Sequence, residues 1–156
     1  MNSKHRILFV CIHNSARSQM AEAFLKKHGG EVFEAESAGL EPGTLNANVV
    51  EVMKEVGIDL TGKPTQAVFD LFQQGRLYDA VVTVCDKEAA ERCPIFPGRG
   101  KRVAWSFKDP SSFTGTKEEI LQHTREVRDE IEQKIKEFVR KASAVTYWMS
   151  PSGPTS

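Results

Sequence analysis

Residues 6–18 read Arg6-Ile-Leu-Phe-Val-Cys11-Ile-His-Asn-Ser-Ala-Arg17-Ser18. After Arg6 the chain is continuously apolar as far as Cys11, which is typical of a short strand buried on both faces of a parallel sheet. From Ser18 to His28 the apolar side chains share one helical face, and two glycines then stop the helix. This stretch therefore predicts a strand, a tight polar loop and a helix, the opening unit of an α/β fold.

The rest of the chain continues this alternation. Thr116 and Glu119 have the spacing of a capping box at the start of the longest predicted helix. Further strands are predicted over 32–37, 80–84 and 102–105, and further helices over 45–56, 67–74 and 117–141. Their order predicts a four-stranded parallel sheet with helices on both faces, a flavodoxin-like three-layer sandwich. We expect residues 1–142 to form a single domain and residues 143–156, with the composition of a turn and linker, to be a disordered tail.

The composition argues against several classes of protein. The chain has 156 residues, 21 Lys and Arg against 21 Asp and Glu, and three cysteines. Balanced charge is unusual for a general nucleic-acid or acidic-membrane binder, and no apolar stretch approaches the ~18 residues of a membrane span. Three cysteines are too few for a disulfide scaffold. We therefore expect a monomeric, cytoplasmic protein with free thiols that binds neither nucleic acid nor a membrane.

The loop that follows the first strand has the residues of an oxyanion site. Backbone N–H groups of a curled loop and the N-terminus of the next helix can point at one anion, and Arg17 can bind two of its oxygens with a planar guanidinium. The same positive environment favours the thiolate form of Cys11, and the hydroxyls of Ser15 and Ser18 can donate to its sulfur. A thiolate beneath a bound oxyanion is placed for in-line attack. The alternative is a buried strand-end cysteine beside an ordinary surface arginine.

Several motifs together resemble a known family. Residues 11–23, followed in order by 36–39, 52–59 and Asp109-Pro110, resemble the low-molecular-weight protein tyrosine phosphatases and, more closely, the arsenate reductases built on that fold. The resemblance covers residues 5–140 and implies a phosphatase-like sandwich, arsenate as the substrate, and thioredoxin as an external reductant with no bound cofactor. The predicted oxyanion-binding loop then comprises Ile12, His13, Asn14, Ser15, Ala16, Arg17 and Ser18. His13 and Ala16 stand where many members have glycine and a further cysteine.

Two further cysteines, Cys85 and Cys93, lie eight residues apart. Cys85 closes a strand that should neighbour the first strand, so we expect it to emerge near Cys11. Reduction of an oxyanion needs two electrons, which two thiols supply by forming one disulfide, whereas a phosphatase needs only the first cysteine. The pair resembles that of thioredoxin-linked arsenate reductases and implies a relay through all three thiols. The alternative is two buried structural thiols, and zinc fits poorly because no histidine lies at ligand spacing.

Asp109 follows the last predicted strand and precedes a proline. A carboxylic acid that faces the anion can protonate a leaving oxygen, and the proline restricts Asp109 to extended conformations. The alternative is a simple Asp-Pro turn. The family resemblance favours the role of an acid.

The resemblance also bears on metal binding. In some members of the family that this chain resembles, a monovalent cation lies near the positions of Asn14, Glu22 and Ser37. Gln66 stands where an acidic residue is expected to complete that site. We therefore predict no metal ion.

The sequence thus predicts an enzyme of arsenic detoxification that reduces arsenate to arsenite. In the implied relay, Cys11 attacks arsenic, Cys85 attacks the sulfur of Cys11 and releases arsenite, and Cys93 then attacks Cys85. A low-molecular-weight protein tyrosine phosphatase is the first alternative, and weak phosphatase activity is compatible with the reductase. A non-enzymatic oxyanion-binding or redox-sensing module is the second alternative. A glutaredoxin with a small thiol is an alternative reductant.

Overall fold

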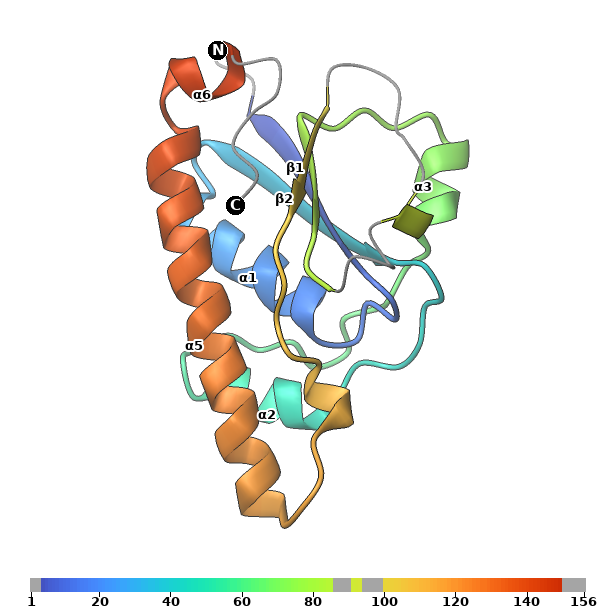
Figure 1. Ribbon diagram of the computed structural model, residues 1–156, viewed down its shortest axis with the longest axis vertical. Helices are drawn as coiled ribbons and strands as arrows, with labels where there is room; N and C mark the ends of the chain where they lie inside the picture. Colours follow the sequence, from blue (N-terminus) through green and yellow to red (C-terminus); the bar gives the residue numbers. More distant parts are fainter. Residues whose placement is uncertain (1–3, 86–90, 94–99, 150–156) are drawn as a thin grey trace.

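The computed structural model describes residues 4–85, 91–93 and 100–149. At its centre lies a four-stranded sheet with the strand order β2-β1-β3-β4, in which every neighbouring pair is parallel (Figure 1). The strands are β1 (His5–Cys11), β2 (Phe33–Gly39), β3 (Ala80–Thr83) and β4 (Lys101–Ala104). The predicted parallel α/β sheet is confirmed. Because β1 has a strand on each side and helices over both faces, its residues 7–10 are fully buried, which explains their continuous apolar run.

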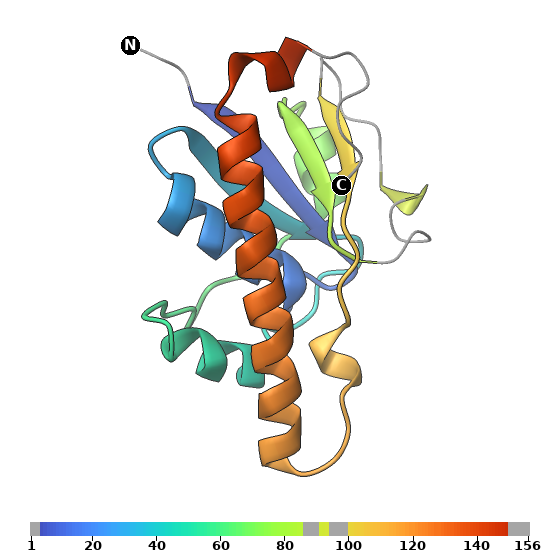
Figure 2. The same ribbon diagram turned by 60° about the vertical axis from the view of Figure 1, so that its left-hand side comes forward.

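Helices cover both faces of the sheet. The helices are α1 (Arg17–Gly29), α2 (Ala47–Lys54), α3 (Val68–Gln73), α5 (Lys117–Ala142) and α6 (Val145–Met149), with a short 3-10 turn η1 (Pro110–Ser112). On one face α1 and α5 pack together, and Figure 2 shows α5 lying across the sheet with α2 beside its first half. On the other face lies α3 (Figure 1). No helix in the described ranges is both long and apolar enough to cross a membrane.

Local signals in the sequence account for both ends of α2 and for the start of α5. The predicted capping box of α5 is present, because the Thr116 hydroxyl and the Glu119 carboxylate each accept from the other residue's backbone N–H. Helix α2 is shorter than predicted and begins at Ala47, because the Asn46 side chain caps it by accepting from two backbone N–H groups. Gly57 follows in the left-handed region with a φ of 82°, where a helix commonly ends in glycine.

The prediction of a disordered tail from residue 143 is wrong for its first part, because residues 145–149 form α6. The Trp148 ring stacks on the His5 ring, with centroids 4.2 Å apart, and its Nε1–H donates to the Ala142 carbonyl over 2.7 Å. Tyr147 is buried beside α5. Aromatic burial of this kind offsets the entropy of ordering a short segment, which composition alone does not reveal. The last seven residues of the predicted tail lie outside the described residues.

The topology brings three predicted site segments to one edge of the sheet. In parallel strands all carboxyl ends point the same way. Cys11 ends β1, Cys85 follows β3 by two residues, and Asp109 follows β4 by five. The loops after three neighbouring strands therefore meet around the N-terminus of α1.

Candidate active site

Cys11 lies at the bottom of the loop between β1 and α1. Its side chain is buried, with 3% of the residue exposed. The backbone N–H of Asn14 donates to its sulfur over 3.2 Å, and the Ser18 hydroxyl lies 2.9 Å from the same atom. Ser18 therefore makes the predicted hydroxyl contact with the sulfur. The contact shown for Ser15 is with its backbone carbonyl, which accepts from the Asn46 N–H.

Asn14 gives the loop its curl. It is fully buried and is the only non-glycine residue in the described ranges with a positive φ, at 55°. Its side-chain amide donates to Ser18 over 2.8 Å, its side-chain oxygen accepts from the Gln66 N–H, and its carbonyl accepts from Gln19. A strained backbone conformation persists where its surroundings fix it from several sides. These contacts keep the Asn14 N–H directed at Cys11.

Gly39, the last residue of β2, lies directly against this loop. A Cβ atom there would lie 2.8 Å from three backbone atoms, the nitrogen of Asn14, the carbonyl carbon of His13 and the oxygen of Ile12. We expect Gly39→Ala to lower the free energy of unfolding by about 2 kcal/mol, because rigid backbone must move to admit the methyl group. Urea unfolding measures this loss.

Gly43→Ala is the matched control for that substitution. The atom nearest to a Cβ at Gly43 would be the His13 Cβ at 3.5 Å, an ordinary contact. We expect its free energy of unfolding to stay within about 0.5 kcal/mol of the parent value. Equal effects of the two alanines would show that Gly39 is not held by close packing against the loop.

Arg17 is the first residue of α1 and reaches across the mouth of the loop. It is 7% exposed, its Nη1 donates to the Phe107 carbonyl over 3.1 Å, and its Nη2 lies 3.6 Å from Asp109 Oδ2. Its Nε is buried and has no hydrogen-bond partner within the described part of the chain. Buried donors are rarely left unpaired in native proteins. The guanidinium is thus held in place on one side while a donor remains available to an anion.

Asp109 lies beside Arg17, as the resemblance implies. Its backbone is extended, with φ −81° and ψ 114°, as expected of a residue before proline. One carboxylate oxygen accepts from the Ser111 N–H over 2.9 Å, which caps η1, and the other faces Arg17. Its side chain keeps partial exposure at 37%. The carboxyl is therefore fixed at the mouth of the loop and remains in contact with solvent.

Cys85 and Cys93 are both buried, and none of the three cysteines of the chain is in a disulfide. The Cys85 thiol points at the carbonyl of Val10, 3.8 Å away, and Val10 directly precedes Cys11. The expected proximity of Cys85 to the first strand's end is thereby confirmed. Burial raises the pKa of the Cys93 thiol, and the positive charge of Arg102 opposes this only in part. Cys93 is therefore a protonated thiol in this state.

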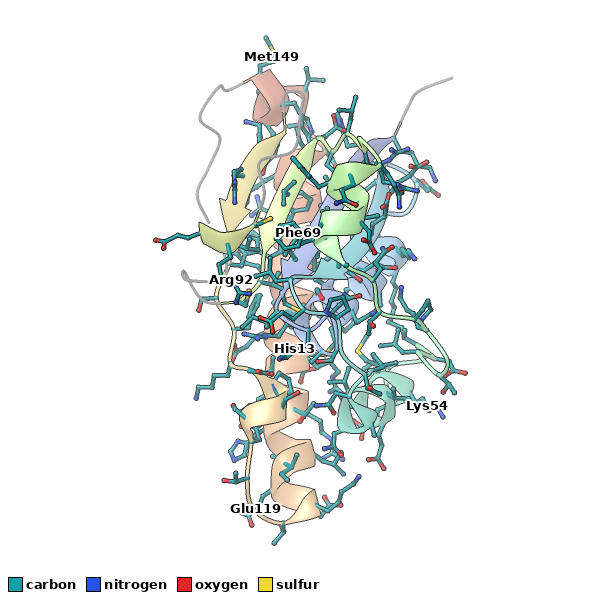
Figure 3. The ribbon with its side chains drawn as sticks, turned by 90° about the vertical axis from the view of Figure 1, so that its right-hand side faces the viewer. His13, Lys54, Phe69, Arg92, Glu119 and Met149 are labelled. Carbon is teal, nitrogen blue, oxygen red and sulfur yellow. The ribbon has the colours of Figure 1, made fainter. Side chains whose placement is uncertain are left out.

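The rim of the site includes a contact that sequence reasoning missed. The Arg92 guanidinium lies 2.7 Å from the Glu41 carboxylate, and its hydrogen bond lowers the pKa of Glu41. The Glu41 N–H donates to the Ile12 carbonyl, and its own carbonyl accepts from His13 Nδ1 over 2.8 Å. In Figure 3, His13 lies between Phe69 on α3 and Lys54 on α2, and Arg92 lies to one side of it. The segment that carries Cys93 is thus linked to the anion-binding loop through Glu41.

Residues 6–146 match the family model of the low molecular weight phosphotyrosine protein phosphatases. The chain belongs to this family. It is 43% identical to an arsenate reductase of Bacillus licheniformis over 87% of this chain and 96% of that protein. The solved structure of an arsenate reductase from Archaeoglobus fulgidus matches with a TM-score of 0.68 and 30% identity, over 86% of this chain and 98% of that one. A thioredoxin-dependent arsenate reductase of Corynebacterium glutamicum matches with a TM-score of 0.60 and 25% identity, over 86% of this chain and 63% of that one.

This member of the phosphatase family presents a nucleophile, a cation and an acid around one loop. Cys11 lies beneath the loop, and Arg17 and Asp109 lie at its mouth. The arrangement suits attack by sulfur on the central atom of a tetrahedral oxyanion, with a proton donor for the departing oxygen.

Proposed function

We propose that this protein reduces arsenate to arsenite with Cys11 as the nucleophile and Cys85 and Cys93 as a thiol relay. The observation that carries the proposal is the position of the buried, reduced thiol of Cys85 beside the strand end that holds Cys11. The likeness to arsenate reductases over nearly the whole length of the domain supports the same conclusion. A single-cysteine reaction has no use for this second thiol.

In the first step arsenate binds in the loop as an oxyanion. Arg17 offers the unpaired Nε–H and the remaining donors of its Nη groups, and the N-terminus of α1 adds further positive potential. The Cys11 thiolate attacks arsenic and forms a sulfur–arsenic bond, while the bond from arsenic to one arsenate hydroxyl group breaks and that group departs as water with a proton from Asp109. Arsenic stays in its +5 state in this step.

In the second step the Cys85 thiolate attacks the sulfur of Cys11. A disulfide forms between the two cysteines, the sulfur–arsenic bond breaks, and its electron pair stays on arsenic, which leaves as arsenite in the +3 state. The Cys93 thiolate then attacks Cys85 and releases Cys11 as a thiolate. An external dithiol reduces the Cys85–Cys93 disulfide and closes the cycle.

The last exchange requires the segment between Cys85 and Cys93 to rearrange. A disulfide needs Cα atoms within ~4.4–6.8 Å of each other, whereas eight residues of helix span ~12 Å. Cys93 is buried and protonated before it attacks. Its movement out of the core would remove the burial that raises its pKa and would bring the new disulfide to the surface. There a thioredoxin can reach it, as the likeness to a thioredoxin-dependent reductase supports.

A coupled assay tests this function. The protein is mixed with thioredoxin, thioredoxin reductase and NADPH, and arsenate is then added while the NADPH absorbance is followed. We expect one NADPH oxidised for each arsenite formed. A parallel assay measures hydrolysis of an aryl phosphate, because dephosphorylation is the second candidate function and the family model supports it.

The three candidate functions predict different results in these assays. Aryl phosphate hydrolysis without arsenate-dependent NADPH oxidation would identify a phosphatase, and neither activity would identify a binding or redox-sensing module. Replacing thioredoxin by glutaredoxin and glutathione shows which reductant serves. A cytoplasmic location belongs to the same proposal, because the three relay thiols need a reducing compartment. A monomeric state is proposed with it from the balanced charge of the chain.

A further inference from the structure

A buried carboxylate lies behind the anion-binding loop. Glu22 on α1 is 3% exposed, its Oε1 accepts from the Ser37 hydroxyl over 2.6 Å, and its Oε2 accepts from two ammonium groups, Lys26 Nζ at 2.5 Å and Lys63 Nζ at 2.8 Å. Burial alone would raise the pKa of Glu22, but the hydrogen bonds from the two lysines and the serine outweigh it and lower that pKa. The carboxylate is therefore ionised, and a buried ion needs a counter-charge.

The two lysines differ in what they connect. Lys26 lies one turn along the same helix, and its side chain is 57% exposed. Lys63 lies between α2 and α3, and its side chain is 28% exposed. Only Lys63 joins the chain between these helices to Glu22 on α1.

The residues that follow Lys63 contact the anion-binding loop directly. The Gln66 N–H donates to Asn14 Oδ1 over 3.0 Å. The Gln19 amide donates both to the Pro64 carbonyl, at 3.2 Å, and to the Asn14 carbonyl, at 3.1 Å. Residues 63–66 thus hold Asn14 in its left-handed conformation, and with it the N–H that reaches the nucleophile.

This region does not fit the monovalent cation that the family resemblance suggests. Such a cation is bound by several oxygen atoms with free lone pairs, and ammonium groups beside those oxygens repel it. Here two ammonium groups already bind one oxygen of Glu22, and the Ser37 hydroxyl donates to the other. Gln66 supplies no carboxylate and donates its amide to the Ser37 carbonyl over 2.8 Å. The chain provides the positive charge itself.

We propose that Lys63 is a positioning residue for Cys11, which neutralises Glu22 and holds the 63–66 segment against Asn14 in place of a bound cation. The proposal rests on the proposed function, because Lys63 would position the nucleophile of that same reaction, Cys11. With Lys63 in this role, we expect the rate of the reaction to be independent of added potassium or ammonium ions.

Lys63→Met and Lys26→Met form a matched pair, because each removes one ammonium from the same oxygen and keeps the apolar stem. The first readout is the rate at which iodoacetamide alkylates Cys11 at pH 7, measured in a chain that also carries Cys85→Ser and Cys93→Ser. The second readout is arsenate turnover, measured in the otherwise unchanged chain. We expect Lys63→Met to slow both by about fivefold or more through loss of the aligned hydrogen bond to sulfur. Lys26→Met should stay within about twofold of the parent, because the Lys26 ammonium is mostly exposed to water and its ion pair with Glu22 stays within α1.

A second measurement uses Lys63→Ala, which leaves space beside Glu22. We expect ammonium or potassium chloride to restore most of its alkylation rate, while choline chloride at the same ionic strength does not. The parent protein and Lys63→Arg should respond to none of the three salts. A purely structural lysine would lower thermal stability without this cation-specific recovery.

Either of two results would overturn the proposal. The first is equal alkylation rates for Lys63→Met and Lys26→Met, and the second is equal recovery of Lys63→Ala in choline. Alkylation needs no arsenate, so it tests the role of Lys63 even if the parent protein does not reduce arsenate. Absence of arsenate turnover in the parent would count against the proposed function and not against the role of Lys63. If Lys63→Met does not fold, the alkylation rates of Lys63→Ala in ammonium chloride and in choline chloride test the proposal instead.

Discussion

Replacing either Cys85 or Cys93 by serine will abolish steady-state arsenate reduction, with a fall in turnover of at least about a thousandfold. A serine hydroxyl cannot attack a sulfur to form a disulfide, so the relay stops at the substituted position. The two variants should stop at different points. Cys85→Ser should release no arsenite in the absence of another thiol. Cys93→Ser should release one arsenite per protein molecule and end as a Cys11–Cys85 disulfide.

Rapid quenching followed by arsenite determination and mass spectrometry of the peptides distinguishes these end states. Cys11→Ser is the control, because it removes the first step and should give neither arsenite nor a new disulfide. Cys85→Ser and Cys93→Ser should still bind phosphate as well as the parent does, because neither thiol belongs to the anion-binding loop. Arsenate reduction at the parent rate by Cys85→Ser and by Cys93→Ser would refute the relay and show that an external thiol reduces the Cys11–arsenate adduct directly.

Local sequence signals predicted the parts of this site that one segment builds. The apolar run that ends at Cys11 and the helix that begins at Arg17 fix the loop between them, so the nucleophile and the guanidinium could be named together. The order of strands and helices also placed Cys85 beside the first strand, because parallel neighbours share one edge. These predictions use only period, spacing and topology.

Contacts between distant segments could not be read in the same way. The hydrogen bonds between Glu22 and Lys63 and between Arg92 and Glu41 join residues 41 and 51 positions apart, and nothing in their spacing marks them. Charged residues are common on any surface, so only the fold shows which pairs meet. The α6 helix was missed for a related reason, since Trp148 gains its order from the distant His5 ring. Such pairs depend on tertiary packing rather than on local propensity.

Arg17→Lys is the second substitution with a large expected effect. Lysine keeps the positive charge but replaces a planar fork by a single ammonium. It cannot donate to Phe107, lie beside Asp109 and still offer a free donor to the anion in the way that the guanidinium does. Losing two charge-assisted hydrogen bonds to the oxyanion, each worth about 1.5–3 kcal/mol, predicts a fall in kcat/KM of about a hundredfold to a thousandfold or more.

The control for this substitution is Arg125→Lys. Arg125 also binds a carboxylate through several of its nitrogens, with Nε and Nη2 on Glu55, but it joins α5 to α2 away from the loop. The same chemical change there should cost at most about 1 kcal/mol of stability and leave kcat/KM unchanged. Calorimetric titration with phosphate then separates binding from chemistry, because Arg17→Lys should weaken phosphate binding as well as turnover. Parent-like phosphate affinity and kcat/KM in Arg17→Lys would show that positive charge alone serves this loop and that the fork geometry of Arg17 has no role in it.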